Sequence, residues 1–300
     1  MSIQYAGGTN VNTTFSNSSS PTRREIVDGI VAALTTAGWT TISGSGTGDV
    51  VQESATTPQG LVMRVRIDDP GSGNCARIRV QNQSGSYAQT YGIRLLPEAG
   101  KKWRVIANRY QCFVMVPGST SARSFAAFGT LHIPNTLEGV ITECIWAWGI
   151  SNGDTDTATR PGLRTSMSSH ANFNTPEMCF ILNGSGWEVG NGTNVTSTSM
   201  GLPTLLFTQH SHFALANVPY AYRWHDDSSI FVEALMAFGG QSVVDEAKIR
   251  GQLWDAIIST DVYNAGTVIQ FDSKNFYTIT HNNLGSSTFA PRGTLCVVVP

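Results

Sequence analysis

The chain has 300 residues and a formal net charge of −2, and 13% of its residues are charged, against about 25% in an average soluble domain. The near-neutral charge gives no general electrostatic reason to bind nucleic acid or an anionic membrane surface. No apolar run approaches the ~20 residues that span a bilayer, so membrane insertion is not expected. Of the 19 cations, four are Lys and the other 15 are Arg. A charge-poor surface that keeps Arg and loses Lys is typical of surfaces that contact other proteins.

The N-terminal segment, residues 1–20, is polar and rich in Ser, Asn and Thr. It predicts an extended N-terminal arm that becomes ordered on a neighbouring chain. Its first ten residues lack the basic and apolar regions of a secretory signal.

One amphipathic helix is predicted directly after the arm. Thr22 and Glu25 have the spacing of a capping box, and Gly38 is well placed to end the helix. The residues that recur at helical spacing, and that predict one buried face, are Ile26, Val27, Ile30, Val31 and Leu34.

Two alternating runs, Leu61–Ile67 and Cys75–Asn82, flank a turn-rich segment and predict a β-hairpin. Alternation places apolar side chains on one face and arginines on the other. An arginine-covered face is suited to an acidic protein neighbour or to phosphates, and the plainer alternative is that the arginines pair with nearby Asp and Glu residues. The interface candidates are Arg64, Arg66, Arg77 and Arg79.

Further short apolar runs, separated by Gly and Pro, continue to residue 299 and predict a mainly β protein with β-sandwich or barrel-like domains. The segment 245–258 is ambiguous between helix and strand, and we expect a strand from Arg250 onward because Gly251 and a β-branched pair favour it. The polar stretch after residue 150 is the expected boundary. The predicted organisation is an arm at 1–20, a helix plus β domain at 21–150, a polar bridge or insertion at 151–174 and a β domain at 175–300.

The motifs that carry chemistry are weak, and we expect neither an enzyme nor a cofactor. The Gly/Ser clusters lack the spacing of a nucleophile elbow or a phosphate loop. The five cysteines are odd in number and far apart, which predicts reduced, buried thiols. His210, His212 and Asp226 offer imidazole and carboxylate ligands for a metal, and the alternative is a polar strand end and turn.

Two tryptophans are candidates for ligand contact, because aromatic rings stack on the apolar faces of sugars. Trp187 lies between Gly186 and Glu188, and Trp224 lies beside His225. Core packing is the alternative for both side chains.

Four runs of the chain share a β-rich pattern with one group of known proteins: Arg250–Ala256, Phe276–His281, Arg292–Pro300 and Ala107–Gly118. The N-terminal plan of a helix, Ala37-Gly38-Trp39 and a β run shares it too. These patches resemble virion structural proteins of tailed bacteriophages, and the resemblance transfers no functional residues. It implies a repeated subunit of the particle, in the tail or baseplate.

The expected function is therefore a structural subunit of a phage particle that contacts other copies of itself and other phage structural proteins. The expected location is the virion, after synthesis in the host cytoplasm. The alternatives are a receptor- or glycan-binding module at the tail tip, with a host surface glycan as partner, and a capsid decoration protein.

Overall fold

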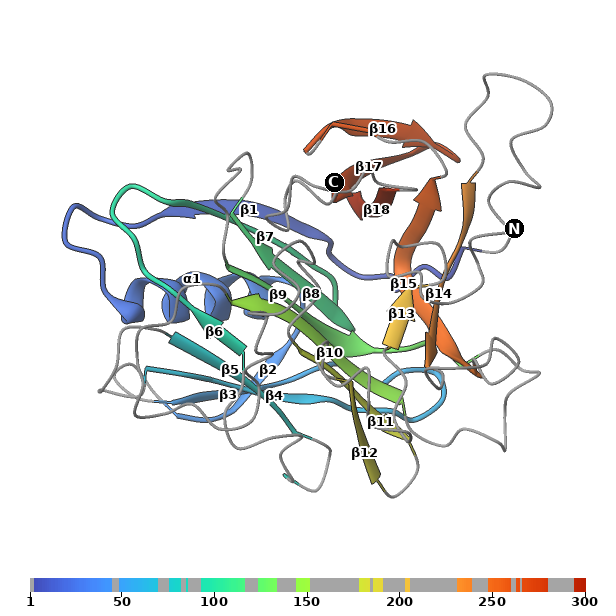
Figure 1. The fold of residues 1–300 in the computed structure, drawn as a ribbon, viewed down its shortest axis with the longest axis horizontal. Helices are drawn as coiled ribbons and strands as arrows, with labels where there is room; N and C mark the ends of the chain where they lie inside the picture. The colour runs from blue at the N-terminus through green and yellow to red at the C-terminus, as the bar shows by residue number, and fades with distance from the viewer. Residues whose placement is uncertain are drawn as a thin grey trace, which may run out of the picture.

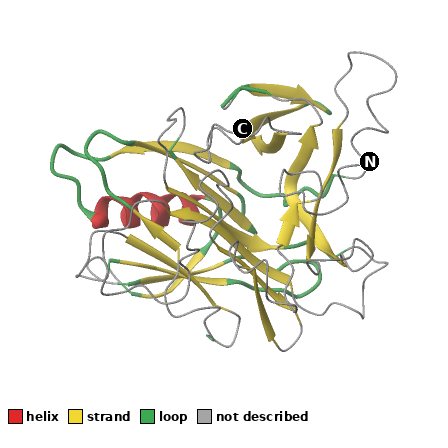
Figure 2. Ribbon diagram, in the orientation of Figure 1, coloured by secondary structure: helices red, strands yellow, loops and turns green. Residues whose placement is uncertain are grey.

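A computed structural model describes residues 3–44, 49–69, 76–81, 85, 93–116, 124–133, 144–151, 178–183, 186–190, 203–205, 231–238, 248–259, 263–264, 266–279 and 294–300. In these residues the fold is mainly β, as the sequence predicts. One helix and three antiparallel sheets, here called A, B and C, make up the described part (Figures 1 and 2).

Sheet A has seven strands, all paired with antiparallel neighbours. In spatial order they are β1 (Val11–Ser16), β7 (Lys102–Ala107), β8 (Gln111–Met115), β9 (Ser124–Thr130), β10 (Cys144–Ser151), β11 (Met178–Asn183) and β12 (Gly186–Gly190).

Sheets B and C are smaller and each is formed by neighbouring segments of the chain. Sheet B has the order β2 (Thr40–Ser43), β3 (Val50–Glu53), β4 (Arg64–Asp68), β5 (Ala76–Gln81) and β6 (Ile93–Leu95). Sheet C has the order β13 (Pro203–Leu205), β14 (Phe231–Phe238), β15 (Lys248–Ser259), β18 (Thr294–Val299), β17 (Lys274–Ile279) and β16 (Val268–Phe271).

Helix α1 (Arg23–Thr36) begins at the capping box of Thr22 and Glu25. The backbone N–H of Glu25 donates to the Thr22 hydroxyl at 3.3 Å, and the Thr22 N–H donates to the Glu25 carboxylate at 2.7 Å. Gly38 follows the C-cap with a φ of 95°, a conformation that glycine adopts without the steric cost of a Cβ. The predicted helix signals therefore coincide with the observed ends.

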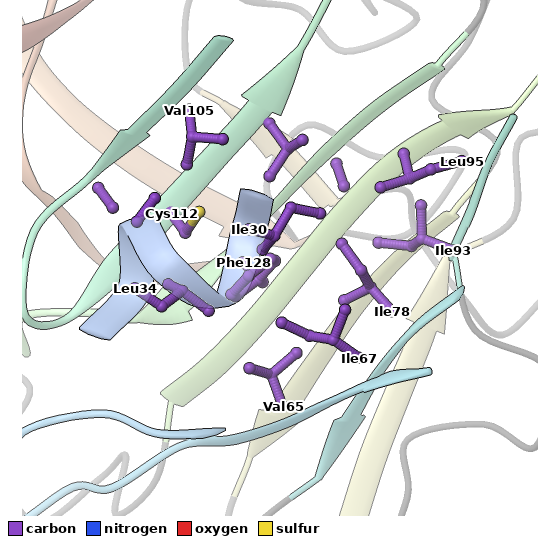
Figure 3. Close-up of a cluster of buried hydrophobic side chains, with 14 of the residues drawn as sticks. Ile30, Leu34, Val65, Ile67, Ile78, Ile93, Leu95, Val105, Cys112 and Phe128 are labelled. Carbon is purple, nitrogen blue, oxygen red and sulfur yellow. The ribbon is translucent and has the colours of Figure 1, made fainter. Parts of the chain in front are cut away.

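Sheet A is the central layer, and its middle strands β7 to β10 contribute buried side chains to both faces. One face packs with α1 and sheet B in a single apolar cluster, so that the helix lies between two sheets (Figure 1). Figure 3 shows Ile30 and Leu34 of the helix, Phe128 of sheet A and Ile67 of sheet B directed into this common core. The opposite face of sheet A packs on sheet C through a second cluster that includes Phe113 and Trp146. Because neighbouring residues of β8 face opposite layers, all five of its residues are buried.

The N-terminal arm packs on its own chain. Ile3 and Tyr5 pack against the outer apolar cluster of sheet C, and β1 then pairs with β7 along all six of its residues. The arm therefore has anchors within its own chain, namely the ladder to β7 and the outer apolar cluster of sheet C. That a neighbouring chain orders the arm further stays a prediction.

Sheet A continues across the predicted boundary at 151–174. β10 precedes this stretch and β11 follows it, and the two strands pair in register from Cys144 opposite Asn183 to Gly149 opposite Met178. The strand predicted over the ambiguous segment 245–258 is present as β15.

Candidate functional site

The four predicted interface arginines lie on one face of β4 and β5, as the alternation predicts, and each is half-buried. Arg64 Nε lies 2.7 Å from Glu53 Oε2, and Arg66 pairs with Asp49. Arg77 forms two 3.0 Å bonds with the two carboxylate oxygens of Asp68.

Asp68 is the hub of this arginine cluster. It accepts hydrogen bonds from Arg77 and also from Arg79, and its side chain is fully buried. A buried carboxylate between two guanidinium groups is stabilised by both, and its loss would leave two desolvated cations. These ion pairs within the chain support the plainer alternative, in which the arginines satisfy their own Asp and Glu residues.

The other predicted site residues are only partly placed. Trp187 lies in β12, opposite Leu182 of β11, and its side chain is outside the described set. Trp224, His210, His212 and Asp226 all lie outside the described residues. Within the described part, no three His, Cys, Asp or Glu side chains lie close enough together to hold a metal ion.

Two cysteines can be assessed. Cys112 and Cys296 are free thiols and both are buried, as the sequence predicts. Burial raises the pKa of the Cys296 thiol to about 12 and raises that of Cys112 as well, so both remain protonated and unreactive at neutral pH.

The most unusual local geometry in the described part is a bulge in β15. Glu233 of β14 pairs with Ile257, and Leu235 pairs with Gln252. An advance of two residues along β14 therefore corresponds to five residues along β15. The extra residues include Asp255, which has a φ of 49° and is 2% exposed. Left-handed backbone at a buried aspartate is held only where the surrounding contacts determine it.

Those contacts come from the arm and from a turn of sheet A. The Asp255 carboxylate accepts hydrogen bonds from the backbone N–H of Ala6 at 3.0 Å and from the side-chain amide of Asn108 at 2.9 Å. The Asp255 N–H in turn donates to the carbonyl of Gln4 at 2.7 Å. One residue of sheet C therefore fixes both the arm and the β7–β8 turn.

Neighbouring residues of the bulge also bind sheet A. The Gln111 side chain acts like a strand neighbour of Trp254: its amide donates to the Trp254 carbonyl, and its oxygen accepts from the Trp254 N–H at 3.2 Å. His132 and Gln252 exchange two backbone hydrogen bonds of 2.9 and 2.8 Å. The bulge is thus the polar junction of sheets A and C.

A pocket of about 370 Å³ opens beside the bulge. Burial raises the pKa of Asp255 above its ordinary value of 3.8, although the bonds from Ala6 and Asn108 and the charge of Lys274 oppose this shift. Burial first, and then Asp272, raises the pKa of Tyr5 to about 12. The lining is mainly polar and includes Tyr5, Asn10, Asp255, Ser273, Lys274 and Asn275.

The outer strands form the second candidate surface. Among the described residues, the large apolar side chains that are exposed are Ile42 at 42% and Val268 at 54%. Both lie on edge strands, β2 of sheet B and β16 of sheet C. Neither strand contains a charged residue or a proline, and the same holds for β1 at the edge of sheet A. Charges and prolines are the usual means of blocking strand addition at an edge.

Sequence reasoning missed the Asp255 junction. Asp255, Asn108 and Gln111 are far apart in sequence and none belongs to a recognisable motif. Gly251, which we took as a sign of a strand, lies at a second irregularity of β15, where Met236 pairs with Gly251 and Ala237 with Ile249, so it does not mark the Asp255 bulge.

No protein-family model matches the chain, and a comparison with curated proteins finds no match. No helix of the described part is both long enough and apolar enough to cross a membrane. The functional assignment therefore depends on the geometry of this chain.

Proposed function

We propose that the chain is a structural subunit of a tailed-phage particle, placed in the tail or baseplate, where it contacts further copies of itself and other phage structural proteins. It acts in the virion, after synthesis in the host cytoplasm, and needs no catalytic activity or cofactor for this role. The observation that carries the proposal is the set of uncharged edge strands β1, β2 and β16, one on each sheet. An assembly subunit gains from such edges because they accept strands from neighbours.

The layered packing supports a β-sandwich architecture with an N-terminal helix and arm. Sheet A shares one apolar cluster with sheet B and another with sheet C, which is the face-to-face arrangement of sandwiched sheets. The low charge content also agrees with a surface that other proteins cover.

The direct test is to locate the chain in the particle of the phage that encodes it. Antibodies against the recombinant chain are applied to purified particles and imaged by immunogold electron microscopy, with mass spectrometry of the same preparation. Labelling at the tail or baseplate in many copies is the expected result. Purified, infectious particles that lack the chain would overturn the proposal, and labelling of the head surface would favour capsid decoration.

A receptor- or glycan-binding module at the tail tip is the second candidate, and the pocket beside Asp255 is the observation that favours it. The side chains of Asn10, Asp255 and Asn275 provide the amide and carboxylate groups that bind hydroxyls. Saturation-transfer NMR with surface saccharides of the host tests this candidate, with an Asn275→Ala variant as the comparison. Equal transfer to both proteins would exclude this pocket as the binding site.

A further inference from the structure

The edge strand β16 is joined to β17 by the shortest kind of hairpin turn. Phe271 pairs with Lys274, so only Asp272 and Ser273 form the loop, with φ values of 50° and 58°. Two successive residues in the left-handed region define a type I′ turn, which matches the twist of the two strands. The register of β16 is therefore fixed.

That register determines where the backbone groups of β16 point. In an antiparallel pair, residues alternate between those that bond to the partner strand and those that face away from it. Phe271 directly flanks the turn, so its backbone groups bond to β17. By the alternation, Gln270 faces away from β17 and Ile269 bonds to it again. The bond from the Thr278 N–H to the Thr267 carbonyl, 2.9 Å, continues the same alternation. The N–H and C=O groups of Val268 and Gln270 consequently point outward.

The side chains alternate as well. Val268 and Gln270 are exposed, whereas Ile269 and Phe271 are half-buried and pack on the outer apolar cluster of sheet C, which contains Phe276. The strand has no bulge, since all four of its residues pair in continuous register. Strand β2, with the other exposed apolar residue, has an irregularity between Thr41 and Ser43, a feature that hinders strand addition.

We propose that two copies of the chain pair through β16, antiparallel about a two-fold axis, with Ile269 of one copy opposite Ile269 of the other. In this register Val268 lies opposite Gln270 of the second copy, so all four outward groups of each strand are bonded. Shifting the register by one residue would bring an exposed side chain opposite a half-buried one, and shifting it by two would leave outward groups unbonded. The result is one sheet that continues through both copies.

A second copy fits this edge for two further reasons. β16 has no charge, so identical strands do not repel each other, and Asp272 would lie opposite Gly266 of the second copy. The two Ile269 side chains meet in a non-hydrogen-bonded pair, where side chains approach most closely. Their contact joins the outer apolar clusters of the two sheets C into a continuous one.

The biological role of this contact rests on the proposed function as an assembly subunit, but the contact itself is tested on the purified full-length chain. An Ile269→Cys substitution places two cysteines face to face, within the span of a disulfide. Mild oxidation is expected to convert most of this variant to a covalent dimer. Val268→Cys is the matched control, because residue 268 faces residue 270 of the other copy, and the wild type controls for the five native cysteines.

Sedimentation velocity over a range of concentrations gives a second readout. Val268→Lys adds one positive charge to the exposed edge of each copy, and therefore two to the dimer contact. It is expected to weaken dimerisation about tenfold or more. Ile42→Lys makes the same change on β2 and is expected to leave dimerisation unchanged.

The outcomes separate this proposal from the proposed function. Cross-linking specific to Ile269→Cys, together with loss of dimer in Val268→Lys alone, supports the β16 contact. If the Val268→Lys variant self-associates as strongly as the wild type, or if the Ile42→Lys variant loses the dimer, the β16 contact is overturned. The assembly role is unaffected by either result. If the chain binds only a different protein and forms no dimer with itself at any concentration, the β16 contact is also overturned. Only absence of the chain from purified particles overturns the assembly role.

Discussion

The side-chain amide of Asn108, in the turn between β7 and β8, donates a 2.9 Å hydrogen bond to the carboxylate of Asp255, in the bulge of β15. This bond joins two sheets across 147 residues of sequence. Because the same carboxylate also accepts the N–H of Ala6, the arm and the sheet junction depend on one side chain. We therefore expect the start of the arm, around Ala6, and the packing of sheets A and C to lose stability together when Asp255 is changed.

The first prediction concerns the free energy of unfolding of Asp255 variants. Asp255→Ala leaves the Ala6 and Asn108 donors without their acceptor and keeps a side chain in left-handed backbone, so a loss of about 2 to 4 kcal/mol is expected. Asp255→Gly removes the same bonds but relieves the backbone strain, so its loss is expected to be about 1 kcal/mol smaller. Urea denaturation of both variants measures the difference. Equal stability of both variants and the wild type would contradict the role of this carboxylate.

The second prediction is a pH dependence with a definite sign. Burial raises the folded-state pKa of Asp255 above the ordinary 3.8, so the folded state favours the protonated carboxyl. Its contribution to stability is fully present below the unfolded pKa and is lost as the pH rises through the folded pKa. Asp255→Asn cannot titrate at this position. The free energy of unfolding of the wild type minus that of this variant should therefore fall as the pH rises above the ordinary pKa of 3.8. A difference that grows as the pH rises would contradict the prediction.

Local signals predicted the local elements, and contacts between distant segments decided the rest. The capping box of Thr22 and Glu25 marks the helix start because both partners lie within one turn. The β4–β5 hairpin follows from alternation and turn residues over a single short segment. The docking of β1 on β7 needs a partner about 90 residues away, shown by the pairing of Thr13 with Val105, and no sequence period encodes it.

The arginine face shows the same division. Alternation predicted which side chains share a face, because strand geometry sets it. The alternation did not show what the arginines contact. Their partners Asp49 and Glu53 lie in a different segment of the chain, and the burial of Asp68 depends on tertiary packing. The sequence alone therefore named the arginines but left the choice between an interface and an internal network undecided.

The third prediction separates the buried and the half-exposed ion pairs of that network. Asp68→Ala removes the shared partner of Arg77 and Arg79 and is expected to cost about 3 to 5 kcal/mol in the free energy of unfolding. Glu53→Ala removes the partner of Arg64, whose side chain is 29% exposed, and is expected to cost at most about 1 kcal/mol. Urea denaturation of the two variants tests the ranking. A larger loss for Glu53→Ala would mean that Asp68 is not the hub.

The fourth prediction is that the N-terminal arm is protected in a single copy of the chain. The Ala6 N–H donates to a buried carboxylate, and the Asn17 N–H donates to the Lys101 carbonyl at 2.9 Å, so both amides should exchange slowly with solvent. Hydrogen exchange is measured by mass spectrometry at a dilution where sedimentation shows monomer. Protection at this dilution distinguishes docking within the chain from ordering by a neighbour.

The Asp255→Gly variant provides the control for this exchange measurement. It removes the acceptor of Ala6 but leaves the ladder between β1 and β7 in place. Exchange at Ala6 should therefore accelerate, while the amides of β1 that bond to β7 keep their protection, because the two anchors of the arm are separate. Rapid exchange throughout residues 3–16 in the dilute wild type would show that the arm needs a second chain. Such a result would agree with the prediction, made from the polar composition of the arm, that a neighbouring chain orders it.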